Sequence, residues 1–327
     1  MKTTLPLVIL PLLVNLLFTV NSNASDKPDH HAPIGVMRDH VHKKGEIMTS
    51  YRYSYMKMKG LRDKNGKISN AQAHQNYMVL GKEMTMEMHM IGAMYGVTDK
   101  LTLSAMGNIM VKNMDHSHKM AADFNREVED FGDSKIHALY EFVNDGNYRA
   151  QLNLGLSLPT GNINKKYNGA RLPYGMQIGS GSYEFLPGLS LSGEGDGFSY
   201  GMQINGVFRL DGNENGYKLG DEYNITSWIA KNLNENLSIS SRLDYNKNEA
   251  VEGKDSSLNI AMTPLADPSL QDREKLDLLF GVNFIVSRGV LSGNRIALEF
   301  GRTIYQKIAG PNLGNDYKFV IGWQKSF

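Results

Sequence analysis

The most regular feature of this chain is an alternation of apolar and polar residues with a period of two. Across 149–158 every even position is Ala or Leu, and the odd positions are small or polar. A similar alternation runs through 198–210, 237–245 and 276–286. Residues two apart share one face of a β-strand, so this period predicts strands that are apolar on one face.

About twelve strands are expected from this period, and each is long enough to cross a bilayer when it is tilted. A barrel strand can cross a bilayer with only every second residue apolar, so a mildly hydrophilic chain can still form a membrane barrel. The expected strands are roughly 45–58, 83–96, 100–113, 133–144, 147–158, 183–192, 197–210, 221–232, 236–247, 274–287, 294–305 and 317–327.

The connections between these strands alternate in length. Short ones such as Thr98-Asp99, Asp145-Gly146 and Leu233–Glu235 carry the residues of tight turns. Outer-membrane barrels have this rhythm, with short periplasmic turns and long extracellular loops, whereas a soluble β-sandwich does not need it. We expect an all-β chain with a single transmembrane antiparallel up-and-down β-barrel over 45–327. The long polar connections cover 59–82, 114–132, 159–182, 211–220, 248–273 and 306–316.

The N-terminus has the features of a secretory signal peptide over 1–24. Lys2 precedes an apolar run, Leu5–Val20, and small residues lead to a cleavage site after Ala24. A membrane anchor is the alternative, but the run is short and broken by prolines. A His-bearing periplasmic segment, 25–44, is expected next. Together these features predict export to the outer membrane of a Gram-negative bacterium.

The last strand ends on an aromatic residue. Phe319, Ile321, Trp323 and Phe327 share its apolar face, and Lys325 is the departure from that face. A terminal aromatic that closes an alternating strand resembles the signal read by the barrel insertion machinery. The expected partners are therefore outer-membrane lipid, that machinery and a small-molecule solute.

Charge and cysteine content exclude several classes of function. The chain has 35 Lys+Arg against 34 Asp+Glu, so no net field favours nucleic acid. The absence of Cys removes cysteine-based catalytic and metal sites. No Gly-x-Ser-x-Gly motif is present, and Ser134 and His137 are three apart, on opposite faces of a strand. We expect no catalytic residues and no enzyme activity.

Charged and imidazole side chains on the polar faces of the strands are candidates to line the lumen. Mixed signs can form salt-bridged walls beside a wet path, or they can simply fill a narrow barrel. Both outcomes stay open from the sequence. The candidates are Arg52, Glu87, His89, Lys135, His137, Glu141, Arg149, Arg209, Arg242, Asp244, Asp277 and Glu299.

Methionine and histidine concentrate in the first third of the chain. Fourteen of the 18 Met lie between Met37 and Met120, and all nine His precede Ala138. The even-numbered Met84–Met94 share one strand face, which we expect to face lipid or core. Thioether and imidazole ligands select copper, so other residues are candidate metal ligands near the outer mouth or in the N-terminal segment. These are Met56, Met58, Met110, Met114, His116, His118, Met120, His40 and His42.

Several segments resemble the family of outer-membrane transporters associated with the meta-cleavage pathway of phenol degradation. The His- and Met-rich first third is the most specific part of this resemblance. The family implies a barrel that moves small hydrophobic or aromatic compounds and brings no catalytic residues. The matching segments are 32–37, 40–46, 50–53, 84–103, 114–116, 131–133, 158–161 and 179–188.

Three functions are compatible with these observations. The first is an outer-membrane channel or transporter for a small, hydrophobic or aromatic solute, with no required cofactor. The second is an envelope protein that binds or tolerates copper through its His- and Met-rich third, with a copper ion as ligand. The third, which the sequence favours least, is a barrel enzyme that acts on lipid.

Overall fold

The computed structural model describes residues 31–287, 289 and 291–327. The expected signal peptide, 1–24, and residues 25–30 lie outside this range. Within it, no helix combines the length and the apolar character that a membrane span requires.

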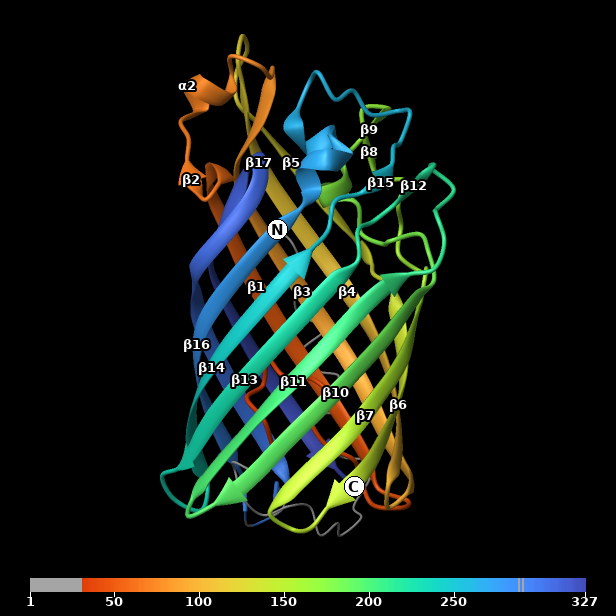
Figure 1. Ribbon diagram of the computed structural model, residues 1–327, viewed down its shortest axis with the longest axis vertical. Helices are drawn as coiled ribbons and strands as arrows, with labels where there is room; N and C mark the ends of the chain where they lie inside the picture. Colours follow the sequence, from red (N-terminus) through yellow and green to blue (C-terminus); the bar gives the residue numbers. More distant parts are fainter. Residues whose placement is uncertain (1–30, 288, 290) are drawn as a thin grey trace.

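Antiparallel strands form a closed barrel, as predicted (Figure 1). Each main strand is hydrogen-bonded to the next one along the chain, and β17 returns to pair with β1. Most bounds differ from the predicted ones by only a few residues. The wall strands are β1 (Ile47–Lys64), β3 (Val79–Thr98), β4 (Leu101–His118), β6 (Ser134–Asn144), β7 (Tyr148–Leu158), β10 (Glu184–Gly195), β11 (Phe198–Arg209), β13 (Glu222–Asn232), β14 (Leu237–Asn248), β16 (Arg273–Ile285) and β17 (Asn294–Ser326).

The long element β17 crosses the barrel twice. Its first part pairs with β16 and its last part pairs with β1. Arg295 near its start donates a hydrogen bond to Gln324 near its end, so the element doubles back on itself. The eleven wall elements therefore give the twelve crossings that the sequence predicted. The expected loop at 306–316 is instead extended backbone within this element.

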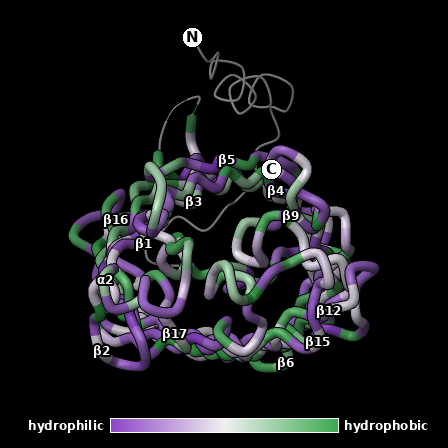
Figure 2. The backbone as a smooth tube through the Cα atoms, turned by 90° about the horizontal axis from the view of Figure 1, so that it is seen from above, coloured by the Kyte–Doolittle hydropathy of each residue, from purple (hydrophilic) through white to green (hydrophobic). Residues whose placement is uncertain are grey.

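The long connections gather at one end of the barrel and the short turns at the other (Figure 1). Seen from above, the long connections spread around the rim and fold over the mouth (Figure 2). We call these the outer and the periplasmic end. The outer elements are β2 (Gly66–Lys67), α2 (Asn70–Ala73), β5 (Phe124–Phe131), β8 (Lys166–Tyr167), β9 (Ala170–Arg171), η1 (Tyr174–Met176), β12 (Tyr217–Lys218), β15 (Glu252–Gly253), η2 (Pro264–Ala266) and η3 (Pro268–Gln271).

The two faces of the wall have opposite chemistry. On β7, Leu152 and Leu154 point outward and are about two-fifths exposed, at 39% and 42%. Their neighbours Gln151 and Asn153 point inward and are buried. An apolar outer surface lowers its free energy in lipid, while inward polar groups must find partners inside the barrel.

The N-terminal stretch 31–44, which we call the lumen segment, lies inside the barrel. Ala32 and Val36 pack against Trp228, and Ile34 packs against Ala297 and Val320. The alternating apolar residues of this segment therefore contact two parts of the wall, β13 and β17. The expectation of a separate periplasmic segment at 25–44 is therefore corrected for residues 31–42, because the closed wall supplies apolar contacts to Ala32, Ile34 and Val36. Lys43 and Lys44 stay exposed beside the turn that contains Asp99.

A glycine allows the end of the lumen segment to approach the wall. A Cβ added at Gly96 would lie 1.9 Å from the carbonyl oxygen of Lys43. We expect Gly96→Ala to lower the free energy of unfolding by about 1–3 kcal/mol through overpacking. Urea titration followed by heat-modifiable gel mobility measures this loss.

Gly107→Ala is the matched control, because a Cβ at Gly107 meets nothing within 4 Å. Equal urea midpoints for the two variants would contradict the close approach.

Candidate functional site

The centre of the lumen is organised around a buried ion pair. Arg242 on β14 holds Glu299 on β17 through two hydrogen bonds, of 2.7 and 2.8 Å. Glu299 is fully buried, at 0% exposure. The parallel two-bond geometry is the strongest arrangement available to a guanidinium and a carboxylate. It joins two strands that are separated by β16.

A second network lies toward the outer end of the same wall. Lys318 contacts both Asp244, at 2.6 Å, and Asp277, at 2.9 Å, and Lys275 also contacts Asp277, at 3.0 Å. The two carboxylates and two ammonium groups balance in charge. Such a network lets a wall carry charges away from bulk water without an uncompensated ion.

The adjoining part of the wall carries separate pairs. Arg209 contacts Glu184 at 3.0 Å and Glu222 at 2.5 Å, and Arg149 pairs with Glu194. These pairs use strands β7, β10, β11 and β13. The lumen is therefore lined by partnered charges around most of its circumference.

Hydrogen bonds from the walls hold the backbone of the lumen segment. The donors and acceptors come from several strands, so the segment is fixed from more than one side. The bonds are from Gly35 N to Glu299 Oε2 (3.1 Å), from Arg295 Nη2 to the Ala32 carbonyl (2.7 Å), from Gln203 Nε2 to the Met37 carbonyl (3.0 Å), from Gln151 Nε2 to the Arg38 carbonyl (2.6 Å) and from His42 N to Thr102 Oγ1 (2.7 Å).

Ten of the twelve predicted lumen residues lie on inward faces. They lie on the same strand faces as buried polar residues such as Asn153, Ser157 and Thr102. The inward residues are Arg52, Lys135, His137, Glu141, Arg149, Arg209, Arg242, Asp244, Asp277 and Glu299.

Glu87 and His89 were predicted to face the lumen, and this prediction was wrong. On β3 they share the face of Ile91 and Tyr95, which point outward and are each 48% exposed. Tyr53 donates a hydrogen bond to Glu87, at 2.7 Å, and the Tyr51 hydroxyl lies 2.8 Å from His89 Nδ1. These pairings satisfy polar groups on the outer surface.

The inward face of β3 is instead the methionine face. Met84 and Met94 are buried on it, as expected for a stripe that faces lipid or core. Met84 joins an apolar cluster at the outer end, which also contains Met176 and Leu265 from the long connections. The inward side needs apolar residues here because these connections pack against it.

The candidate metal residues separate into three places. Met58 and Met114 are buried in that apolar cluster, with Met56 and Met110 packed against it. The His116 ring stacks on Phe124, with centroids 4.7 Å apart. His118 Nδ1 accepts a hydrogen bond from the Met120 backbone, and the Met120 side chain is largely exposed. His40 and His42 lie in the lumen segment.

Several residues of this site were not among the candidates. Arg295 shares the polar face of its strand with Glu299, so the alternation could have identified it. Gln151, Asn153 and Gln203 are uncharged and gave no comparable signal. The apolar residues at 32–37 were visible in a polar region, but nothing local indicated which surface they cover.

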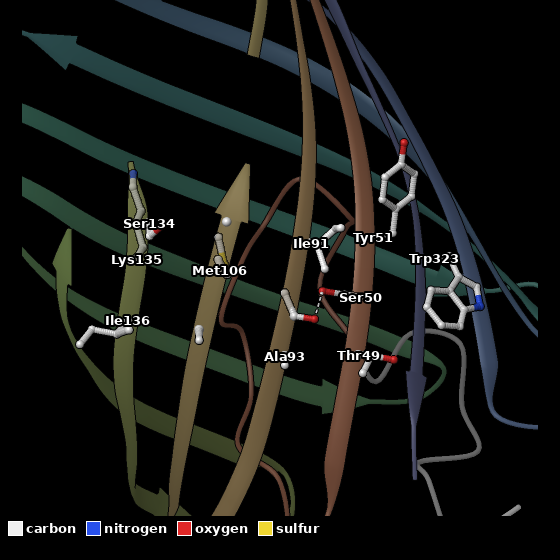
Figure 3. Close-up of a pocket in the computed structure, with 13 residues that line it drawn as sticks. Thr49, Ser50, Tyr51, Ile91, Ala93, Met106, Ser134, Lys135, Ile136 and Trp323 are labelled. Atoms are coloured by element: carbon white, nitrogen blue, oxygen red, sulfur yellow. Dashed lines mark hydrogen bonds between the residues drawn. The ribbon is translucent and has the colours of Figure 1, made fainter. Parts of the chain in front are cut away.

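A hollow of about 460 Å³ lies on the outer surface of the wall (Figure 3). Its floor has small residues, Ala93, Ala105 and Gly107, and Tyr51 and Ile136 stand at its edges. Small side chains create the depression because neighbouring strands carry larger ones. In a membrane this hollow faces lipid.

The C-terminal aromatic residues seal the junction between the first and last strands. The Phe327 amide donates to the Ile47 carbonyl at 2.7 Å, and Phe319 stacks on Tyr55 with ring centroids 5.4 Å apart. Trp323 Nε1 donates to Asn294 Oδ1 at 2.7 Å. Ile321 faces outward with them.

The profile of the family described as "Putative MetA-pathway of phenol degradation" matches residues 69–300. The chain belongs to this family. No curated protein sequence matches it. The fold of this family member, a closed antiparallel β-barrel, is that of a known outer-membrane channel.

One solved structure supports the fold of this family member. An outer membrane channel from Pseudomonas putida F1 superposes with a TM-score of 0.65 at 12% identity, covering 89% of this chain and 98% of that one. The β domain of the Bordetella autotransporter BrkA has a TM-score of 0.45 at 13% identity, covering 87% and 100%.

Removal of Arg242 tests the central ion pair. We expect Arg242→Ala to lower the free energy of unfolding by about 3–5 kcal/mol, because Glu299 then stays buried without its partner. The control Arg302→Ala removes an exposed ion pair with Asp316 and should cost no more than about 1 kcal/mol. Urea titration compares the two, and equal losses would contradict the assignment.

Proposed function

We propose that this barrel carries a small hydrophobic or aromatic solute across the outer membrane, and that the lumen segment controls passage. The observation that carries the proposal is the position of this segment. It lies in the lumen and is held there by hydrogen bonds, by small apolar contacts and by the attraction between Asp39 and the buried arginines Arg52 and Arg295.

Movement of the segment is energetically feasible. Each backbone hydrogen bond to the wall contributes only about 0.5–1.5 kcal/mol net, because water can replace the wall groups. The apolar contacts involve Ala32, Ile34 and Val36, which are small to medium side chains. A displaced segment leaves the wall pairs such as Arg242 with Glu299 and Arg209 with Glu184 intact, while Arg52 and Arg295 lose the nearby carboxylate of Asp39.

The outer end of the lumen supports an apolar solute. The cluster around Met58, Met84, Met114 and Met176 is buried beneath the long connections, and its flexible thioether side chains can rearrange around ligands of varied shape when those connections move. A polar solute would lose water at this point without gaining hydrogen bonds. The family description adds an association with phenol degradation, and an aromatic solute fits both.

We infer a transport role rather than catalysis. Ser134 contacts Thr160, whereas His137 lies on the opposite face and contacts Arg38 at 3.3 Å. A nucleophile and a base must lie within hydrogen-bond reach of each other. These two side chains do not meet that requirement.

A disulfide that fixes the lumen segment to the wall tests the proposal. A Cβ added at Gly322 lies 2.7 Å from Cγ1 of Ile34, which suits a disulfide between Ile34→Cys and Gly322→Cys. The chain has no native Cys to interfere. Uptake of N-phenyl-1-naphthylamine by cells with an otherwise intact outer membrane provides a fluorescence readout.

The wild-type barrel should increase the rate of uptake, the oxidised double variant should not, and reductant should restore the rate. The matched control, Ser50→Cys with Gly92→Cys, joins β1 to β3 within the wall and should transport in both redox states. A folded wild-type barrel that never increases uptake would rule out the solute class. Equal uptake by the locked and reduced forms would rule out control by the segment.

We also propose that the insertion machinery recognises the C-terminal aromatic face. We expect Phe327→Ala to lower the yield of folded barrel in the outer membrane several-fold. Lys325→Ala, at the position that departs from the pattern, is the control. Heat-modifiable mobility of membrane fractions measures the yield, and an unchanged yield for Phe327→Ala would contradict the proposal.

A further inference from the structure

Three potential metal ligands meet within the lumen segment. His31, Asp39 and His40 each offer a donor atom, and these atoms all lie within 4.8 Å of one another. His31 Nδ1 lies 3.3 Å from His40 Nδ1, which in turn lies 3.0 Å from Asp39 Oδ1. The sequence indicated His40 but gave no reason to join it to His31.

These distances match the edges of a metal coordination polyhedron. Metal–donor bonds of about 2.0–2.2 Å place neighbouring ligand atoms about 2.9 Å apart in a square-planar site and about 3.3 Å apart in a tetrahedral one. The separations of 3.0 and 3.3 Å lie within this range. Binding an ion would therefore require only small movements of the side chains.

The surrounding structure orients the carboxylate. The Ala32 amide donates to Asp39 Oδ2 at 2.8 Å, which leaves Oδ1 directed at His40. The preceding carbonyl, of Arg38, accepts hydrogen bonds from Gln151 and Asn153 on the wall. Ligands held by such outer contacts bind metal more tightly than free side chains do.

Two imidazole nitrogens in the same place have no protein partner. The Nε2 atoms of His40 and His42 are buried and form no hydrogen bond with any residue that the structure describes. His42 is only 3% exposed, and its ring centroid lies 4.8 Å from that of His40. Buried nitrogen atoms without partners are costly, and they mark His40 and His42 as imidazoles whose hydrogen bonding within the described residues is incomplete.

We propose that His31, Asp39 and His40 bind a divalent transition-metal ion, with Cu²⁺ held most tightly. Imidazole and carboxylate donors suit ions of borderline softness, and Cu²⁺ forms the most stable complexes in the divalent series. Met37, Met48 and Met94 line the small cavity that also contains Asp39, which adds thioethers nearby. The ion would join residue 31 to residues 39 and 40 and stabilise the lumen segment.

Three arginines near the site, Arg38, Arg52 and Arg295, oppose this ion. Arg52 lines the same cavity, is buried, and brings a positive charge. Replacing it with a neutral residue should strengthen metal binding, because Coulomb repulsion is removed in a region of low dielectric constant. An anion bound in this cavity would respond in the opposite direction.

Titration of the full mature barrel with Cu²⁺ tests the proposal, in detergent and after removal of any affinity tag. We expect one ion per chain, with nitrogen hyperfine splitting in the electron paramagnetic resonance spectrum. His40→Ala should weaken binding by more than about 100-fold, and Asp39→Asn by about 10-fold or more. Arg52→Gln should bind more tightly than the wild type.

The matched control is His118→Ala, at the outer end, which should bind Cu²⁺ like the wild type. Hydrogen exchange of residues 31–44 should slow when Cu²⁺ is added to the wild type but not to His31→Ala. Heat-modifiable mobility confirms that each variant is folded. Equal affinity of wild type and both His31→Ala and His40→Ala, or loss of binding in His118→Ala alone, would overturn the site.

Discussion

The pairing of β1 with β17 is the constraint on which the rest of the molecule depends. Lipid offers no hydrogen bonds, so a strand edge left open in a membrane would expose a row of unpaired backbone groups. The pairing from Met48 with Ser326 to Tyr55 with Phe319 removes that edge without a register shift. Once the wall is closed in this register, the inward or outward direction of each wall residue is fixed.

Closure also creates an interior whose polar groups need partners. Some partners come from other strands, as in the pair of Arg242 with Glu299. Others come from the lumen segment, whose backbone offers the Gly35 amide and the Arg38 carbonyl to the wall. The segment and the wall therefore satisfy one another, and the same contacts position Asp39 beside two histidines.

The chemistry of the lumen changes along its length. The outer end has an apolar, methionine-rich cluster that includes Met84 and Met114, whereas the middle is lined by paired charges. An apolar solute can lose its water at the outer cluster at a low cost in free energy. In the proposed mechanism, the charged middle stays closed to the solute while the lumen segment is in place. A metal-stabilised segment would link the two proposals, because the ion would favour the closed arrangement.

The sequence by itself determined the strands, the alternation of turns and loops, and most of the inward residues, since these depend on local periodicity and turn chemistry. The prediction that Glu87 and His89 face the lumen was wrong, because a strand with methionine on one face and polar groups on the other fits either orientation. Only the tertiary structure settled that, and it also placed 31–44 inside the barrel and His31 against His40. Such contacts depend on groups far apart in the sequence, which are brought together only when the wall closes.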